Sequence, residues 1–354
     1  MNSPSAATRV AVNTLANYAR FAVSTLVWVV LTPRMVHGFG EQDYGLWSLV
    51  YSVVGFFSLL DLGMGTGVVK CVAESGGTGD VDRRNRMVST YAAAYAGVAL
   101  AAAAILGLLS LAFNRLFSIP AEAHGRALAT LWIIGLRAVV LAFPLSLFRG
   151  ILYGQQSLLL LNLLQAASTV AYGVGAAVAL AGGYGVVAVA VVSLLSMLLE
   201  HGLYAAFAWR RTPGLRIAPA LVDPRLLREA ASLSVSQLLI AVSGLALLRT
   251  DPVVIQLFLG LSAVGVYTIA LKAAENGFVL VKQFVNALSP LVAHLHGARR
   301  ADRVQEVLVA GTRLALVPAA LLAAGVAALG GRALVLWVGP EFAAGTWPMI
   351  LLVV

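Results

Sequence analysis

VSTYAAAYAGVALAAAAILGLLSLAF, residues 88–113, carries no charged side chain from its first residue to its last. At 1.5 Å per residue, about 20 apolar residues in a helix cross the hydrocarbon core of a bilayer, so this stretch is long enough to span it. It lacks the alternation of apolar and polar residues that membrane β-strands show. A helix also satisfies its own backbone hydrogen bonds, as lipid requires. The stretch therefore predicts a transmembrane helix.

The whole chain has a composition similar to that of this stretch. Hydrophobic residues make up 60% of the sequence and charged residues 11%, and the mean hydropathy is +0.90. A soluble domain needs roughly a quarter of its residues charged to solvate its surface. The composition therefore predicts an all-α integral membrane protein. The one cysteine, Cys71, excludes a disulfide framework.

Further apolar stretches bring the expected number of transmembrane helices to about ten. They are residues 10–32, 44–68, 88–113, 127–151, 158–181, 185–208, 230–254, 263–290, 305–330 and 343–354. The first stretch is too long for the apolar region of a signal peptide, so we expect it to remain as the first span.

Positive charge is divided unevenly between the connections, and Lys and Arg are retained on the cytoplasmic side of a membrane. The N-terminus and the even-numbered connections hold the larger set: Arg9, Lys70, Arg83, Arg84, Arg86, Arg149, Arg210, Arg211, Arg216, Arg225, Arg228, Arg299, Arg300 and Arg303. The odd-numbered connections and span ends hold Arg34, Arg115, Arg126, Arg249 and Arg332. The N-terminus is therefore predicted to be cytoplasmic. Because these residues form no single patch, we predict no nucleic-acid partner.

The chain also contains an internal repeat. When it is aligned with itself without a gap, Gly40 falls on Gly260, Asp82 on Asp302 and Pro120 on Pro340. The repeat unit holds about six spans, so both copies are expected to enter the membrane in the same orientation, as parallel lobes.

The repeat predicts the domain organisation. Residues 1–208 form a six-helix lobe, 209–229 a basic, proline-containing cytoplasmic linker, and 230–354 a second lobe of about four helices. We expect the second lobe to be incomplete because the chain is a fragment of a longer protein; a degenerate second lobe is the alternative.

Ionisable groups at bilayer depth cost several kcal/mol, so they are expected to face a cavity or one another. The deep groups are Arg20, Asp61, Arg137, Lys272, Glu275, Lys282 and Arg313. Their excess of positive charge predicts a cavity that attracts phosphate-like anions and repels cationic drugs. The candidate substrate-binding residues are Asn17, Arg20, Arg137, Lys272, Lys282 and Arg313, and the candidate ion-coupling residues are Asp61 and Glu275.

Structural roles compete with these assignments. Lys272 and Glu275 have the spacing of an ion pair within one helix, Arg313 has the length to reach the membrane interface, and Asp61 suits a plain salt bridge.

The glycines 63, 65 and 67 have no preceding strand, so they predict close helix packing or a broken helix in place of a phosphate loop. His294 and His296 lack carboxylate or thiol neighbours. We predict no metal, cofactor or catalytic residue.

Several short stretches resemble the polysaccharide-transporter (O-antigen flippase) branch of the multidrug/oligosaccharidyl-lipid/polysaccharide exporter superfamily. They are Phe39-Gly40 through Tyr44-Gly45-Leu46-Trp47, Leu59-Leu60-Asp61-Leu62-Gly63, Val69-Lys70-Cys71-Val72-Ala73-Glu74, Gly150-Ile151-Leu152-Tyr153-Gly154-Gln155, Val264-Gly265-Val266-Tyr267 and Leu288-Ser289-Pro290. The resemblance implies a MATE-like fold of two lobes, with alternating access around a cationic central cavity.

The same resemblance implies a function. It implies a flippase of the bacterial inner membrane that exports an undecaprenyl-pyrophosphate-linked oligosaccharide for polysaccharide or lipopolysaccharide biosynthesis, driven by a proton or sodium gradient. The implied partners are this lipid-linked oligosaccharide, the coupling ion, membrane lipids and a polysaccharide polymerase.

Three other functions fit parts of the sequence. A cation-coupled multidrug exporter of the same fold requires an acidic cavity. An integral-membrane enzyme acting on lipid-linked sugar requires acidic or histidine clusters on sizeable loops, whereas these loops are short and rich in arginine. A non-transporting scaffold leaves the deep charges unexplained.

Overall fold

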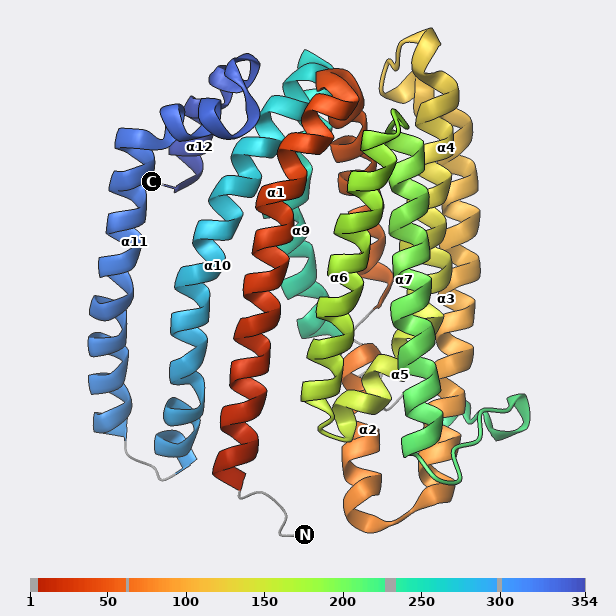
Figure 1. Ribbon diagram of the computed structural model, residues 1–354. Helices are drawn as coiled ribbons and strands as arrows, with labels where there is room; N and C mark the ends of the chain where they lie inside the picture. Colours follow the sequence, from red (N-terminus) through yellow and green to blue (C-terminus); the bar gives the residue numbers. More distant parts are fainter. Residues whose placement is uncertain (1–5, 62–63, 227–233, 298–300, 354) are drawn as a thin grey trace. The chain divides into compact units, whose positions relative to one another are not determined.

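The computed structural model describes residues 6–61, 64–226, 234–297 and 301–353, and within these ranges the secondary structure is helical throughout. Figure 1 shows long helices, many of which run alongside one another. The helices are α1 (Ala6–Gly55), α2 (Met64–Thr78), α3 (Val81–Leu116), α4 (His124–Gly135), α5 (Ala142–Gly154), α6 (Leu158–Ala181), α7 (Val186–Arg211), α9 (Ser234–Leu259), α10 (Leu261–Gly297), α11 (Ala301–Val338) and α12 (Thr346–Val353).

The chain forms two compact units, Met1–Leu261 and Ser262–Val354. In the first unit, α6 packs between α1 and α7, and α9 packs on α1. In the second unit, α12 and the 3₁₀ helix Pro340–Gly345 pack on α11. The predicted division into lobes of residues 1–208 and 230–354, joined by the linker 209–229, stays a prediction.

Six helical stretches of the described residues are long and apolar enough to cross a membrane: Val12–Asp61, Val81–Leu116, Ala121–Gly154, Leu158–Ala181, Val186–Arg211 and Asp302–Val338. Their outer faces carry large apolar side chains, such as Leu100, Leu108 and Leu111 of α3, which are 70–82% exposed. A soluble protein rarely exposes such a continuous apolar face, whereas lipid solvates it. The predicted all-α membrane fold is confirmed.

The first of these stretches contains both of the first two predicted spans. Gly40 has φ 74° and ψ 170°, and these backbone angles interrupt α1. In Figure 1 the red ribbon of α1 turns at the top of the view. Glycine adopts positive φ without the steric cost that a Cβ brings. Gly260, its counterpart in the repeat, also has positive φ, 86°, and separates α9 from α10.

The same alignment relates other landmarks of the backbone. α3 begins at Val81 and α11 begins at Ala301, which are equivalent positions of the two copies. Pro120 precedes the short 3₁₀ helix Ala121–Ala123, and Pro340 begins another. These landmarks agree with the internal repeat, and the two lobes inferred from it stay a prediction.

The two copies differ at one place that matters for the candidate site. In the first copy the helix stops at Gly55, continues as the 3₁₀ helix Phe56–Asp61, and resumes as α2 at Met64. The equivalent part of the second copy is the continuous helix α10. The broken helix that the glycines predicted is thus present in the first copy, although Gly63 itself lies outside the described residues.

Glycines in the motifs allow helices to approach closely. A Cβ on Gly67 would lie 2.0 Å from the hydroxyl oxygen of Tyr91, and one on Gly154 would lie 2.7 Å from the Cβ of Val72. A Cβ on Gly45 would lie 1.9 Å from the backbone oxygen of Leu261. These contacts explain why the chain has glycine where α2 packs on α3 and α5, and where α1 approaches the start of α10.

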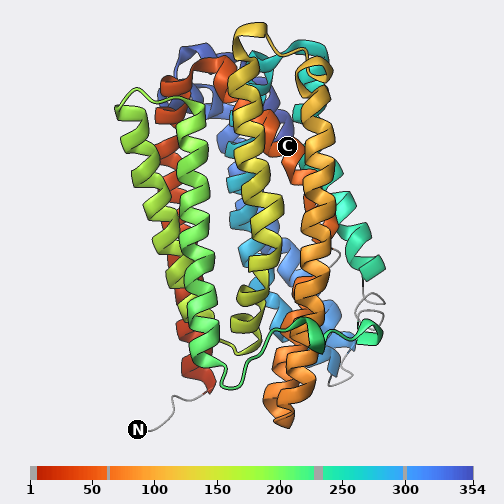
Figure 2. The ribbon, with the colours of Figure 1, turned by 90° about the vertical axis from the view of Figure 1, so that its right-hand side faces the viewer.

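The linker that follows α7, within residues 209–229, is held against α3 by hydrogen bonds. Asn85 of α3 donates its amide to the carbonyl oxygen of Gly214 at 2.8 Å and accepts the backbone N–H of Arg216 at 3.2 Å. Ser89 and Thr90 accept the backbone N–H groups of Ala218 and Asp223 in the same way. The three α3 side chains are buried. Figure 2 shows the linker crossing the lower part of α3.

We expect Asn85→Ala to release the linker from α3. Each lost hydrogen bond weakens the attachment by about 1 kcal/mol, so trypsin should cleave after Arg211 or Arg216 at least about fivefold faster in the purified protein. Ser110→Ala is the matched control, because that α3 hydroxyl bonds to the carbonyl oxygen of Gly107 in its own helix. Equal cleavage rates in both variants would contradict the attachment.

Candidate functional site

Arg20 lies half-buried on α1, where it faces α6. Its Nε donates to Oδ1 of Asn162 on α6 at 3.0 Å, and one terminal nitrogen donates to Oδ1 of Asn17, one turn earlier on α1, at 2.9 Å. Leu15 and Leu26 of the same helix are 71% and 65% exposed. Arg20 therefore faces protein, whereas these two leucines of α1 are exposed.

Arg137 lies in a short π-helical segment, Leu136–Leu141, that joins α4 to α5. Such a segment adds a residue to one turn and re-aims side chains, and it recurs at functional sites. The Nε of Arg137 donates to the carbonyl oxygen of Ser193 on α7 at 3.2 Å. Its guanidinium lies 6.0 Å from the ring centre of Tyr51 on α1. The charge of Arg137 also acts on the hydroxyl of Tyr172 on α6.

Both arginines share one property that decides what they do chemically. The partners that the structure gives them among the described residues are amides, a backbone carbonyl and an aromatic ring, all of which are neutral. Their positive charges are held in position without being cancelled. Planar guanidinium groups also have donors left for two oxygens of a phosphate. The roles predicted for both arginines in substrate binding stay predictions.

Asp61 ends the 3₁₀ helix of the first unit. The hydroxyl of Tyr95 on α3 donates to its Oδ1 at 3.2 Å. Tyr95 is fully buried and also shares a hydrogen bond with Ser146 of α5. The carboxylate thus lies where α3 and α5 meet the broken helix, and its predicted part in ion coupling stays a prediction.

In the second unit, Lys272 and Glu275 form the ion pair that their spacing allows. Nζ of Lys272 lies 2.6 Å from Oε2 of Glu275, and both side chains are largely covered, at 24% and 22% exposed. Each charge therefore offsets the other within one turn of α10. Lys272 should therefore attract an anion less strongly than its single positive charge suggests.

The two other basic candidates of the second unit differ from each other. Arg313 lies on α11 and is exposed within the unit. Lys282 lies on α10, but its side chain is outside the described part of the chain. The roles predicted for both in substrate binding stay predictions, as does a chamber shared between the two halves.

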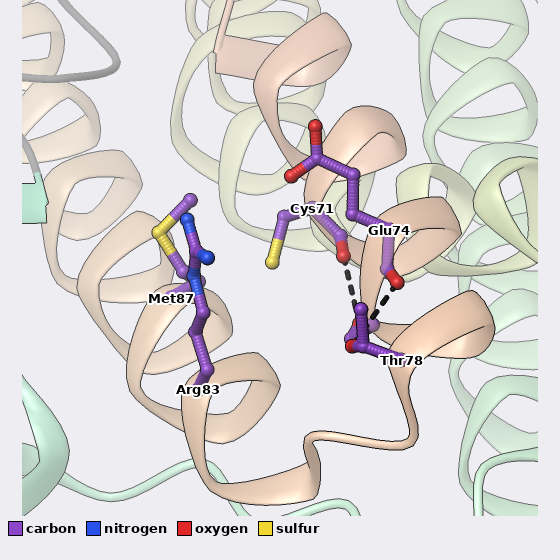
Figure 3. A pocket seen from close by; sticks show the side chains of 6 residues that line it. Cys71, Glu74, Thr78, Arg83 and Met87 are labelled. Carbon is purple, nitrogen blue, oxygen red and sulfur yellow. Dashed lines mark hydrogen bonds between the residues drawn. The ribbon is translucent and has the colours of Figure 1, made fainter.

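A cavity of about 240 Å³ lies between α2 and α3, apart from these arginines. Cys71, Glu74, Ser75, Thr78, Arg83 and Met87 line it, and Figure 3 shows Arg83 and Met87 of α3 facing Cys71 of α2. This volume is well below what a lipid-linked sugar chain requires, since drug-sized ligands already occupy roughly 300–1,000 Å³. We do not assign it to the main substrate.

Sequence analysis missed three polar residues near the arginines. Asn162 is a partner of Arg20. His201 lies on α7 within electrostatic range of Arg149 and Arg137, and Glu200 is its neighbour in the chain. Glu200 and His201 had a signal in the sequence, because they stand well inside the sixth predicted span. Asn162 had none, since its importance comes from its contact with a helix far away in the chain.

Comparison with known proteins identifies the family. A family model described as polysaccharide biosynthesis protein matches residues 7–296. The chain belongs to this family. It is 22% identical over 359 residues to the uncharacterized membrane protein EpsK of Bacillus subtilis (strain 168), and the match covers 94% of this chain and 66% of that protein. The chain therefore spans just under two-thirds of the length of that relative.

Solved structures confirm the fold. An inward-facing multidrug resistance MATE family transporter of the MOP superfamily has a TM-score of 0.72 at 18% identity, over 96% of this chain and 79% of that one. A MOP superfamily transporter from Pyrococcus furiosus Vc1 (DSM3638) has a TM-score of 0.65 at 18% identity, over 96% and 76% of the two chains. This family member is a multi-pass membrane protein with the fold of MATE transporters.

We expect the contact between Arg20 and Asn162 to stabilise the first unit. A hydrogen bond to a charged group is worth roughly 1.5–3 kcal/mol, so Asn162→Leu should lower the free energy of unfolding by about that amount. In a double-mutant cycle with Arg20→Leu, the two losses should overlap by at least about 1 kcal/mol. The measurement is denaturant unfolding in detergent. Strictly additive losses would argue against the contact.

Proposed function

We propose that this family member is a flippase that moves a lipid-linked oligosaccharide across the bacterial inner membrane by alternating access. Its substrate would be an undecaprenyl-pyrophosphate-linked sugar chain, exported from the cytoplasmic leaflet, with the N-terminus of the protein in the cytoplasm. A proton or sodium gradient would drive the cycle. Membrane lipids surround the protein, and a polysaccharide polymerase is the proposed partner that receives the product.

One observation carries this proposal. Arg20 and Arg137 stand on helices long enough to cross a membrane, and their partners among the described residues are neutral. A guanidinium in hydrocarbon costs several kcal/mol unless it has a role or a partner. A pyrophosphate supplies the missing negative charge in bidentate geometry. Cations held in this way favour an anionic cargo over a neutral or cationic one.

The comparisons support the same direction. The family is described in terms of polysaccharide biosynthesis. The transporter from Pyrococcus furiosus is described as having a binding pocket of reverse polarity that suggests a different function. A pocket whose polarity differs between members of the superfamily is compatible with an anionic cargo. The fold and the family favour a transporter over an enzyme.

The remaining candidate residues take secondary places in the proposal. Asp61, with its Tyr95 donor, is the carboxylate that suits ion coupling, whereas Glu275 is already paired with Lys272. Asn17 orients Arg20. Lys272, Lys282 and Arg313 remain proposed contacts from the second unit.

A multidrug exporter is the second candidate, because a structural neighbour is described as a multidrug resistance transporter. That function predicts that deletion of the gene sensitises cells to cationic drugs. The flippase proposal predicts unchanged drug susceptibility together with a loss of surface polysaccharide.

We expect Arg20→Ala and Arg137→Ala each to lower surface polysaccharide at least about tenfold in a deletion strain that expresses the variant at normal levels. The loss of a charge-assisted contact to the pyrophosphate is worth roughly 1.5–3 kcal/mol, which corresponds to this factor or more. Lipid analysis should show that the lipid-linked oligosaccharide accumulates in the inner leaflet.

Arg34→Ala is the matched control on the same helix. Arg34 is exposed and donates to the carbonyl oxygen of Val30 in its own turn, so the variant should export normally. Normal polysaccharide in both deep variants would refute the anion site. Absence of the lipid-linked oligosaccharide itself in the deletion strain would point to an enzyme.

A further inference from the structure

Glu200 and His201 lie deep within the span formed by α7. By the rise of 1.5 Å per residue, Glu200 is about 15 Å along the axis from Arg210 near one end and about 21 Å from Val186 at the other. Both side chains are half-buried. Two neighbouring ionisable groups at this depth are costly unless the protein uses them.

The contacts of this pair determine which ring nitrogen of His201 can accept a proton. The hydroxyl of Tyr204, which is fully buried, donates to Oε1 of Glu200 at 2.7 Å. Nδ1 of His201 lies 3.1 Å from the carbonyl oxygen of Met197. Because a carbonyl only accepts, Nδ1 carries the hydrogen and Nε2 of the neutral ring holds the lone pair. The bond to Met197 therefore persists whether Nε2 is protonated or not.

Charged groups from neighbouring helices surround the pair. Arg149 of α5, which lies 5.5 Å from the ring centre of Tyr153, and Arg137 of the π-helical segment both act electrostatically on the His201 ring. Glu200 acts in the opposite sense, and Tyr153 lies within range of Tyr204. From α6, Ser168 donates to the carbonyl oxygen of Ser196 one turn before the pair. The histidine thus lies within electrostatic range of one carboxylate and two guanidinium groups.

We infer that Glu200, His201 and Tyr204 form a proton-binding site whose loading strengthens anion binding at Arg137. The inference rests on the proposed function, since it assigns a regulator to the proposed anion site. The proton comes from solution and adds to Nε2 of His201, so the site gains one positive charge. Glu200, held by Tyr204, balances that charge.

The sign of the coupling follows from the arrangement of charges. In the empty protein, Arg137 and Arg149 repel an imidazolium at His201. An anion bound at Arg137 cancels part of that repulsion and favours the protonated ring. Because coupling between two sites is reciprocal, the proton tightens the anion by the same factor. Proton and anion therefore favour each other's binding at these two sites.

The test uses the full chain in lipid nanodiscs with UDP-N-acetylglucosamine as the probe. Its pyrophosphate is a diester and keeps its charge where histidines titrate, between about pH 5.5 and 8. We expect the Kd from calorimetry to be at least about fivefold lower at the acidic end of this range. Titrations in two buffers of different ionisation enthalpy should show net proton uptake on binding.

Variants locate the effect. His201→Gln should still bind the probe but lose the pH dependence and the proton uptake, and Glu200→Gln should reduce both. His124→Gln is the control, because that ring contacts Ile119 at the other end of α4 from Arg137, and it should behave as the wild type. If His201→Gln fails to fold, proton uptake by the wild type and its reduction in Glu200→Gln decide the matter.

Three results would overturn the inference, and they separate it from the proposed function. Binding with equal Kd across the pH range, or weaker binding at acidic pH, would refute the proton site and leave the anion site intact. A pH dependence that His201→Gln and Glu200→Gln both retain would place the proton elsewhere. Absence of probe binding at every pH would count against the anion site, and with it this inference.

Discussion

The structure depends on how a guanidinium group is kept inside a bundle of apolar helices. In water an arginine needs no partner, but in lipid each unsatisfied donor costs several kcal/mol. The chain supplies polar groups from three helices: Asn17 on α1, Asn162 on α6 and the carbonyl oxygen of Ser193 on α7. These partners satisfy donors without cancelling charge. The first unit can therefore be both stable and cationic, which a set of ion pairs would not allow.

This constraint explains an irregular part of the backbone. A regular helix from His124 to Gly154 would leave the direction of Arg137 to the ordinary helical period. The π-helical segment that begins at Leu136 changes that direction locally and places the guanidinium against α7 and the ring of Tyr51. The break before α2 places the carboxylate of Asp61 beside Tyr95 of α3. Both irregularities occur next to charged residues, as expected where backbone geometry serves a site.

Much of the fold could be predicted because it depends on local properties. Long apolar stretches determine the spans, and Gly40, Gly260, Pro120 and Pro340 mark turns through the backbone angles that these residue types prefer. The candidate site was less predictable, because its partners are tertiary. Nothing in the sequence near Asn162 connects it to Arg20, and the binding of the linker to Asn85 of α3 likewise depends on packing.

The structure also changes where the excess of positive charge lies. Sequence analysis counted Lys272 among the deep cations, but Glu275 one turn away offsets its charge. Arg20 and Arg137 keep their charge because their described partners are neutral. The proposed anion site therefore depends on the first unit more than the number of basic residues in each half suggests. The effect of a charged group in a membrane protein depends on what the group contacts. An oppositely charged partner within 3 Å cancels most of the electric field that the group produces at a distance.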